Sequence, residues 1–189
     1  MTEKSTNAPL NGRIPGVFPL NFVLRSDLCP ILISNGPMQK IVVLTGAGIS
    51  AESGLQTFRG QNGLWEGHAI EEVATPEAFH NNPEMVYRFY NLRRAQLEDP
   101  AIEPNPAHLA LAHLQKTYGE KFTLVTQNVD NLHEQAGNTK AIHMHGELEK
   151  IRCLKTGETF LWREDLDAST PHPKGISSKL RPHLSLIHI

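Results

Sequence analysis

The sequence predicts an α/β fold built on a parallel sheet, and three observations predict it. Residues 40–45 and 122–126 are continuous apolar runs rich in β-branched side chains, as expected of strands buried on both faces. A glycine turn, Gly46-Ala47-Gly48, follows the first run, and helical patterns separate it from the second. Strands that alternate with helices along a chain pair in parallel, because each helix returns the chain to the same edge.

The other elements follow from start and stop signals. Helices are expected to start at Ser50 and at Thr75-Pro76, and a longer helix spans 83–97 with its apolar residues near one stripe. Asn105-Pro106 opens a helix that ends near Gly119. A short helix over 131–136 follows the second strand, and short strands are expected over 141–144 and 147–152.

Length and composition exclude several classes of protein. A chain of 189 residues with 39% hydrophobic residues suits one domain, or a domain with a small insert. A net charge of −2 argues against a nucleic-acid partner, which needs a concentrated basic surface. No apolar run reaches the length of about 18 residues that a membrane span needs. The two cysteines, Cys29 and Cys153, form no disulfide framework and favour a cytoplasmic location.

Residues 1–37 differ from the rest of the chain. They hold five prolines and three glycines and show no helical or strand period, which predicts a flexible extension. Because Met38 immediately precedes the first strand, we also hypothesise that the native chain begins there.

The glycine turn points to a dinucleotide. Gly46-Ala47-Gly48 with Ala51 fits the G-x-G-x-x-A pattern after a strand, where glycines let the backbone approach a pyrophosphate. The alternative is a tight strand-to-helix turn without a ligand. A dehydrogenase would carry an acidic residue at a strand end about 20 positions on. The sequence instead continues with a polar loop around Thr57 and Trp65, so hydride transfer is disfavoured.

Polar side chains also follow the second strand. Gln127, Asn128 and Asp130 are expected at the carboxyl edge of the sheet, where ligands of open α/β sheets bind. Amides and a carboxylate suit sugar hydroxyls and a carboxamide. The alternative is that Asn128 and Asp130 only cap the next helix.

Two histidines mark the third strand. His143 and His145 stand at i and i+2, which predicts that both face the same way. Two ligands do not make a metal site, but a histidine can act as a base near neutral pH. A hydrogen-bonded structural role is the alternative.

Together these segments resemble the sirtuin family, in particular its bacterial CobB-type deacylases. The matching segments are 46–59, 126–137 and 143–146, in the family's order and spacing, and the resemblance runs from about Ile41 to His183. It implies a Rossmann-like NAD-binding domain with a small inserted module. It also implies an NAD-dependent protein lysine deacylase that transfers the acyl group of acyl-lysine to ADP-ribose and releases nicotinamide.

The resemblance also implies roles for individual residues. His145 would be the general base. Gln127 and Asn128 would contact the ribose, and Asp130 the nicotinamide carboxamide. The remaining residues expected to bind NAD line its phosphates, lie on a mobile cofactor loop or flank these positions: Gly46, Ala47, Gly48, Ala51, Thr57, Phe58, Arg59, Trp65 and Val129.

Tyr90 and Arg93 suggest a preference among acyl groups. Their spacing resembles the Tyr-x-x-Arg pair of sirtuins that accept acidic acyl groups, and i, i+3 places both on one helix face. A guanidinium can hold a carboxylate in a bidentate fork. We therefore expect succinyl-lysine as a substrate beside acetyl-lysine. The alternative is that Arg93 and Arg94 are solvated surface charges.

Zinc is doubtful. Of the cysteines that the family's small module often carries, only Cys153 is present, and Thr156 stands where a partner would fall. A structural zinc site wants four ligands, so Cys153 with His172 and His183 is a weak alternative to a metal-free module.

We expect residues 38–149 to form the first part of the NAD-binding domain, 150–183 a remnant of the small module, and 184–189 the start of a core strand that the chain does not complete. The chain alone is therefore expected to be an unstable, inactive fragment. The protein is expected to be a monomer. Protein ADP-ribosyl transfer is the alternative activity, because it uses the same ribose carbon.

Overall fold

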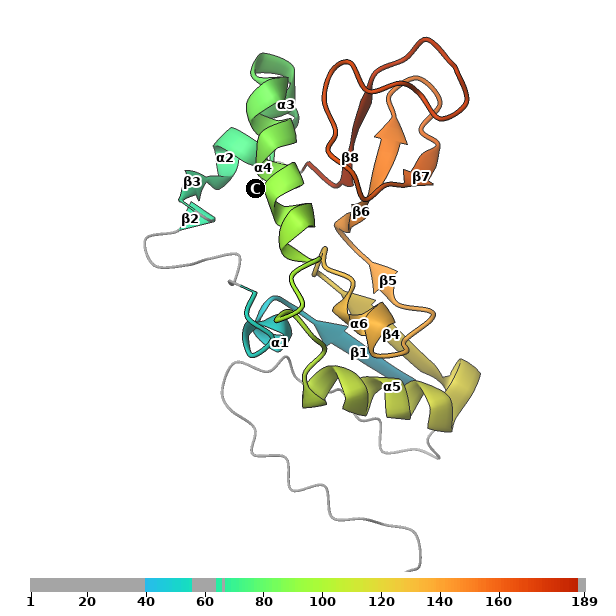
Figure 1. Cartoon of the computed structure of the whole chain (residues 1–189). Helices are drawn as coiled ribbons and strands as arrows, with labels where there is room; N and C mark the ends of the chain where they lie inside the picture. The colour runs from blue at the N-terminus through green and yellow to red at the C-terminus, as the bar shows by residue number, and fades with distance from the viewer. Residues whose placement is uncertain (1–39, 56–63, 66, 187–189) are drawn as a thin grey trace, which may run out of the picture.

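The computed structural model describes residues 40–55, 64–65 and 67–186. Its first sheet has the order β1-β4-β5, with β1 at Ile41–Thr45, β4 at Phe122–Thr126 and β5 at Ile142–His143 (Figure 1). Both pairings are parallel, and Thr45 lies opposite Thr126 at the carboxyl edge. The predicted α/β class with a parallel sheet is confirmed.

One face of this sheet packs against α5 (Pro106–Tyr118). Val43, Phe122 and Leu124 point toward that helix and form a core with Leu111 and Leu114. The alternate residues do not behave as predicted, because Val42 is 54% exposed and Leu44 is 37% exposed. The expectation of a first strand buried on both faces is therefore wrong for the part of the chain that the structure describes.

Three helices precede α5 along the chain: α2 (Ile70–Val73), α3 (Pro76–Asn81) and α4 (Pro83–Gln96). Their starts have side-chain caps, since Thr75 Oγ1 accepts from Ala78 N at 3.0 Å and Asn82 Oδ1 accepts from Met85 N at 3.2 Å. Prolines at the first helical positions fit, because that position has no intrahelical partner for an N–H. The predicted start at Thr75-Pro76 and the predicted span 83–97 are confirmed to within one residue, whereas the start expected at Ser50 is wrong because that helix begins at Gly48.

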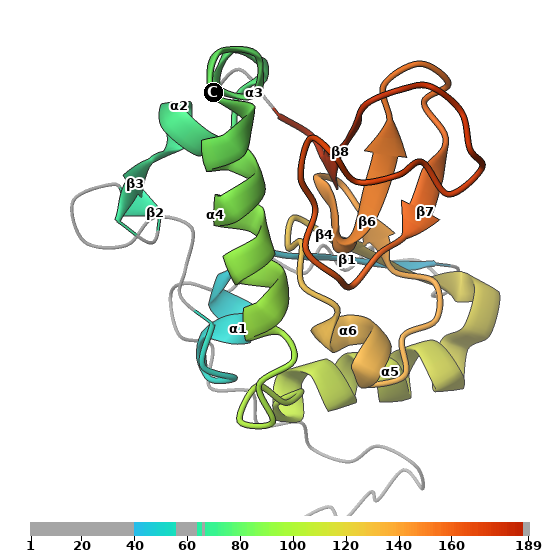
Figure 2. The ribbon, with the colours of Figure 1, turned by 45° about the horizontal axis from the view of Figure 1, so that its top comes forward.

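The second sheet is antiparallel, with the order β7-β6-β8, and lies beside α4 (Figure 2). Its strands are β6 (Gly146–Cys153), β7 (Thr159–Leu161) and β8 (Leu180–Leu184). Gly146 has φ +83° at the irregular start of β6, and a Cβ there would stand 2.0 Å from the His183 carbonyl oxygen. Only glycine allows the two strands to approach so closely at this point.

Arg94 joins α4 to the second sheet. Its side chain is 2% exposed and donates from Nε to Leu148 O at 2.9 Å and from Nη1 to Glu164 O at 3.0 Å. Val86, Phe89, Tyr90 and Leu97 of the same helix region pack with Leu148 and Leu184. The interpretation of Arg94 as a solvated surface charge is therefore wrong, because its donors satisfy backbone carbonyls inside the fold.

The remaining elements are short: α1 (Gly48–Ala51), β2 (Leu64–Trp65), β3 (His68–Ala69), a 3-10 turn η2 (Gly119–Lys121) and α6 (Leu132–Gln135). β2 and β3 form a two-stranded antiparallel pair. None of the helices in the described ranges has the length and apolar character that crossing a membrane requires.

The segment boundaries expected from the sequence can be compared with the strands of the structure. Residues 1–37 lie outside the described residues. The boundary between 149 and 150 falls inside β6, and Leu184, the expected start of a core strand, is the last residue of β8. Both strands belong to the antiparallel sheet.

Candidate functional site

The loops after β1 and β4 meet at the carboxyl edge of the first sheet. Parallel pairing sets Thr45 beside Thr126, and Gln127 N donates to Thr45 O at 2.9 Å. Met144 N donates to Thr126 O at 2.9 Å, which brings the end of β5 to the same edge. All three predicted motifs therefore lie where ligands of open α/β sheets bind.

Ser50 is the centre of a buried hydrogen-bond network at this edge. Its hydroxyl donates to Asp130 Oδ2 at 3.0 Å and accepts from Asn128 Nδ2 at 2.9 Å. His108 Nε2 approaches the same oxygen at 3.5 Å. Asp130 also accepts from Leu132 N at 3.2 Å, and its burial raises the pKa of this carboxyl above the ordinary value. Asp130 thus accepts from the first residue of α6 and ties that helix to Ser50 of α1, although Asn131 is the N-cap of α6.

The hydrogen bonds assign the state of His108. Its Nδ1 accepts from Asn105 N at 3.3 Å, so in the neutral ring the proton is on Nε2, which donates to Ser50. Burial lowers the pKa of His108 and favours this neutral form. Serine, histidine and aspartate are all present, but His108 cannot accept the Ser50 proton in this arrangement. The network positions groups and does not activate a serine nucleophile.

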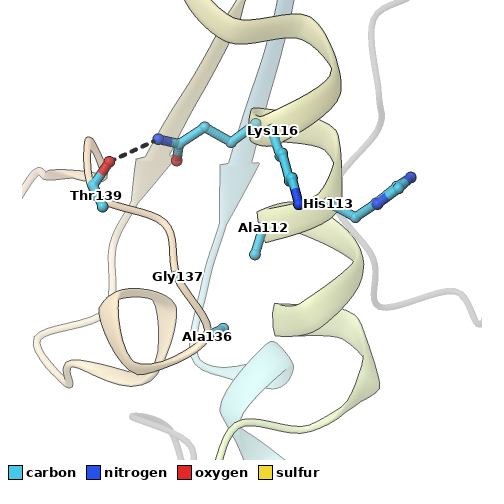
Figure 3. Close-up of a pocket in the computed structure, with 7 residues that line it drawn as sticks. Ala112, His113, Lys116, Ala136, Gly137 and Thr139 are labelled. Atoms are coloured by element: carbon cyan, nitrogen blue, oxygen red, sulfur yellow. Dashed lines mark hydrogen bonds between the residues drawn. The ribbon is translucent and has the colours of Figure 1, made fainter.

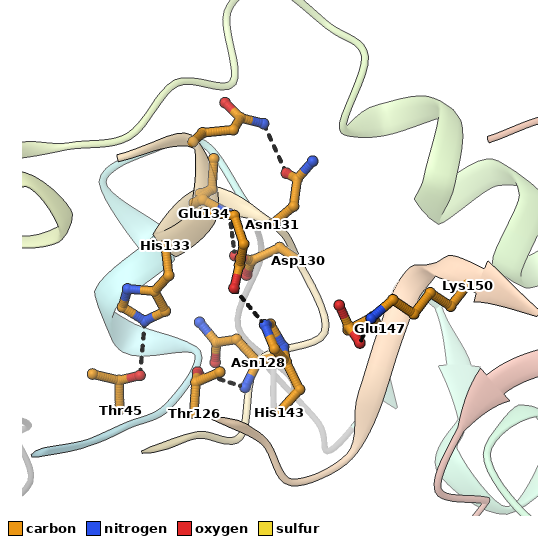
Figure 4. Close-up of polar contacts among 12 residues, drawn as sticks. Thr45, Thr126, Asn128, Asp130, Asn131, His133, Glu134, His143, Glu147 and Lys150 are labelled. Carbon is orange, nitrogen blue, oxygen red and sulfur yellow. Dashed lines mark hydrogen bonds and ion pairs between the residues drawn. The ribbon is translucent and has the colours of Figure 1, made fainter. Parts of the chain in front are cut away.

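His133 links the same edge to the glycine turn. The ring is fully buried, and Nε2 lies 2.9 Å from Oγ1 of Thr45, the residue before Gly46 (Figure 4). Its ring stands edge-on to His108 with centroids 4.9 Å apart. Burial and the neighbouring His108 lower the pKa of His133 to about 4, so it is neutral at physiological pH.

His143 faces two acceptors. Nδ1 lies 2.9 Å from Asn128 O, and Nε2 lies 3.0 Å from Glu134 Oε1 (Figure 4). Burial alone would lower the pKa of His143, but the Glu134 carboxylate and the Asn128 carbonyl together raise it. Both nitrogens can donate only in the imidazolium, so the structural role is the one that the contacts of His143 support.

His145 does not share the surroundings of His143. β5 ends at His143, and His145 lies in a turn before β6, so the i, i+2 strand argument fails. Its Nδ1 is 3.0 Å from Ser185 Oγ, and Ser185 N donates to the His145 carbonyl at 2.9 Å. The half-exposed imidazole thus lies where the two sheets join, one residue after the backbone contact with Thr126.

Space at the glycine turn fits a bound phosphate group. Neither Gly46 nor Gly48 has a positive φ, so a tight turn alone does not require glycine at either position. A Cβ on either would meet none of the described residues within 4 Å, so the missing side chains leave room beside the described part of the chain. Ala47 and Val129 are half-buried, and Gly48, Ala51 and Gln127 are exposed. The turn can therefore admit an oxyanion close to the backbone.

Several predicted residues cannot be placed or are placed elsewhere. Thr57, Phe58 and Arg59 lie outside the described residues, and of Trp65 only the backbone pairing with His68 is described. Tyr90 lies on α4 and is 2% exposed, with burial raising its pKa. Arg93 is half-buried, and its guanidinium carbon lies 4.9 Å from the Phe89 ring centroid.

The suggested metal ligands are not assembled. Among the described residues no three His, Cys, Asp or Glu side chains are placed to hold a metal ion. Cys153 Sγ lies 3.3 Å from Ser178 Oγ and 3.5 Å from Thr156 N, and these hydrogen bonds lower the pKa of the thiol to about 6. His172 Nδ1 accepts from Lys174 N. Serine and threonine therefore occupy the surroundings of the sulfur, which do not fit zinc.

A pocket of about 410 Å³ lies between the second half of α5 and the loop after α6, apart from the Ser50 network (Figure 3). Its lining includes His113, Lys116 and Gly137 but no member of the Ser50 network.

Comparison with known proteins identifies the relationship. A family model described as the Sir2 family matches residues 46–186. The chain belongs to the Sir2 family. An NAD-dependent protein deacylase of Escherichia coli K12 is 57% identical over 149 residues, which cover 77% of this chain and 52% of that protein. One from Salmonella typhimurium is 52% identical over 161 residues, covering 85% and 58%. The chain thus spans about half the length of these curated relatives.

Solved structures of other Sir2 proteins resemble the fold. A Sir2 homologue in complex with NAD is 41% identical, with a TM-score of 0.64 over 76% of this chain and 56% of that one. A variant Sir2 homologue in complex with ADP-ribose is also 41% identical, with a TM-score of 0.66 over 76% and 57%. The predicted family and fold are confirmed.

Sequence reasoning missed the role of Ser50, Asn105 and His108. Ser50 and Asn105 were recognised only as helix starts, and the capping pair of Asn105 and His108 gave the available signal. The contacts of His108 with Ser50 and of Asn105 with Ile49 join segments more than 50 residues apart, which no local pattern reveals.

Proposed function

We propose that the protein is an NAD-dependent protein lysine deacylase. The observation that carries this proposal is the convergence of the Gly46–Gly48 turn, Ser50, Asn128 and Asp130 at one sheet edge. Relatives at 57% identity are named NAD-dependent protein deacylases, and Sir2 neighbours hold NAD or ADP-ribose. Open space at a backbone turn suits phosphates, and the amide and carboxylate suit ribose and carboxamide groups.

The residues would divide the work as follows. Bound NAD would supply an electrophilic ribose carbon and nicotinamide as leaving group. Gly46, Ala47, Gly48 and Ala51 would line its phosphates, and Gln127 with Asn128 would orient the ribose. Asp130, held by Ser50 and Leu132 N, would hold the carboxamide and so fix the ribose carbon toward the acyl-lysine oxygen.

His145 would act as general base. Its contact with Ser185 Oγ orients the ring, and the proposed role is to take a proton from a ribose hydroxyl. The acyl group would then pass to ADP-ribose and free the lysine. General-base catalysis contributes about 10²- to 10⁴-fold, so His145→Ala should lower kcat by that factor.

The full-length protein should convert acetyl-lysine peptide and NAD to nicotinamide and O-acyl-ADP-ribose. Mass spectrometry of the products measures this reaction. His113→Ala, an exposed histidine of α5, is the matched control and should leave kcat unchanged. Labelled ADP-ribose on protein, without O-acyl-ADP-ribose, would instead establish the alternative transferase activity.

We also propose that Tyr90 and Arg93 favour acidic acyl groups. Tyr90 remains a neutral donor because burial raises its pKa, and a guanidinium is the preferred partner of a carboxylate. Arg93→Met should lower succinyl-lysine turnover at least tenfold and leave acetyl-lysine turnover within twofold. Arg88→Met, an exposed arginine on the same helix, should change neither. Equal loss of both activities in Arg93→Met would contradict the carboxylate role.

We also propose that the protein is a monomer located in the cytoplasm. Cys153 is a free, buried thiol, which suits a reducing compartment. Cell fractionation and sedimentation velocity test location and oligomeric state.

A further inference from the structure

The second sheet carries basic side chains on one face. Arg152 of β6 lies directly opposite Arg181 of β8 in the antiparallel register. Leu180, Pro182 and Leu184 are buried, whereas Arg181 and His183 between them are only half-buried. Since side chains alternate along a strand, Arg181 and His183 share the face of Arg152. We call Arg152, Arg181 and His183 the basic face.

The charges of the basic face are not balanced. Like charges directly opposite each other on antiparallel strands repel. Arg152 and Arg181 form no ion pair with any described residue, and the neighbouring Lys150 is already paired with Glu147 at 2.6 Å. Besides burial, Arg152 itself lowers the pKa of Arg181 and of His183, which is the electrostatic signature of this repulsion.

Two polar atoms of the basic face also lack a hydrogen-bond partner. Arg152 Nε and His183 Nδ1 are both buried and make no hydrogen bond with the described part of the chain. Arg181 donates from Nη1 to Pro182 O at 2.9 Å and to Leu184 O at 2.7 Å. An unpaired buried polar group is unfavourable, and an oxyanion beside the two guanidinium groups would offset their mutual repulsion.

The basic face leads to the candidate base. Ser185 directly follows the last residue of β8, and its Oγ is the atom 3.0 Å from His145 Nδ1. Four residues of extended chain separate Arg181 from Ser185, or about 13 Å at ~3.3 Å per residue. An extended peptide has the same rise, so a residue about four positions from one held at His145 would reach the two arginines.

We propose that Arg152 and Arg181 bind the side-chain carboxylate of an acidic residue about four positions from the acyl-lysine in the protein substrate. This inference rests on the proposed function for the identity of the ligand. Arg152 supplies an unpaired guanidinium, and Arg181 the Nη2 side of a guanidinium whose Nη1 is held by backbone carbonyls. Inorganic phosphate offers the same oxyanion chemistry, and the experiment separates the two sources.

The test compares acetyl-lysine peptides with Glu or Gln four positions before or after the lysine, using fluorescence anisotropy for Kd and turnover for KM and kcat. At low salt one Glu peptide should bind at least fivefold more tightly than its Gln partner, with a lower KM and unchanged kcat. Arg152→Gln should abolish the preference. Because it removes the repulsion from Arg181 and no ion pair with a described residue, it should not lower the free energy of unfolding. Arg163→Gln, which removes an exposed ion pair with Glu149, should keep the preference.

The other outcomes separate the failure of this carboxylate site from the failure of the proposed function. Equal binding of Glu and Gln peptides that are both deacylated would reject the carboxylate site and leave the proposed function intact. If inorganic phosphate shifts the NMR signals of Arg152 but the Glu peptide is not preferred, the basic face binds free anions and not the substrate carboxylate. A Glu preference with no turnover would reject the deacylase function but keep the site.

Discussion

At the scale of single residues, Ser50 is the most consequential side chain of the site. Its one hydroxyl serves Asp130, Asn128 and His108, which belong to two other segments. Ser50→Ala would leave these buried groups without their shared partner, and each such group costs about 1–3 kcal/mol. We expect a loss of about 2–4 kcal/mol in urea denaturation, and a loss below 0.5 kcal/mol would contradict the network. Ser177→Ala, at an exposed position, is the control.

His143 gives the site a pH dependence. Its pKa is raised in the folded state above the unfolded value of about 6.5, so its contribution to stability is complete below pH 6.5 and is lost as pH rises through the folded pKa. The free energy of unfolding of wild type should exceed that of His143→Gln by about 1–2 kcal/mol at pH 6, and the difference should shrink toward pH 9. A difference that grows with pH would show that the neutral ring is the stabilising form. Glu134→Gln should flatten the profile, since it removes the carboxylate charge beside Nε2 that raises the pKa of His143.

At the scale of elements, Asn105 and Asn82 allow a matched comparison. Both are N-caps, but Asn105 also donates from Nδ2 to Ile49 O at 2.6 Å and to Ser53 Oγ at 3.0 Å. Asn82→Ala should cost about 1 kcal/mol for the lost cap, and Asn105→Ala at least 1 kcal/mol more because α1 is released from α5. Hydrogen exchange at Ser53 and Gly54 should quicken only in Asn105→Ala. Equal costs would mean that α1 is held by other contacts.

Most elements were predictable because their signals are local. Capping residues with proline fixed the starts of α3, α4 and α5, and apolar runs fixed β1 and β4. β3 and β7 have two and three residues, too few for a period to be seen. β8 was not predicted, because residues 180–183 were assigned to the small module and Leu184 to the start of a separate core strand, whereas all five residues form one strand that pairs with β6.

At the scale of the whole molecule, sequence patterns predicted that the motifs meet at one edge of the sheet. They did not predict the hydrogen bonds that connect the motifs. Parallel pairing of β1 and β4 follows from the α/β order, and it alone brings Gly46 beside Gln127. The expectation that β1 is buried on both faces is wrong, because Val42 and Leu44 are exposed among the described residues. An apolar run indicates a strand that can be covered on both faces, and it cannot say which covering elements the described chain supplies.

The central claim is that NAD binds at the edge shared by the Gly46–Gly48 turn and the Gln127–Asp130 loop. Backbone amide NMR during an NAD titration tests it most directly, because the signals report position whether or not turnover occurs. We expect saturable shifts concentrated at residues 46–51 and 127–130, and their loss in a Gly48→Val variant that fills the open space at the turn. Shifts confined to the pocket beside His113 and Gly137, with residues 46–51 unmoved, would contradict the account.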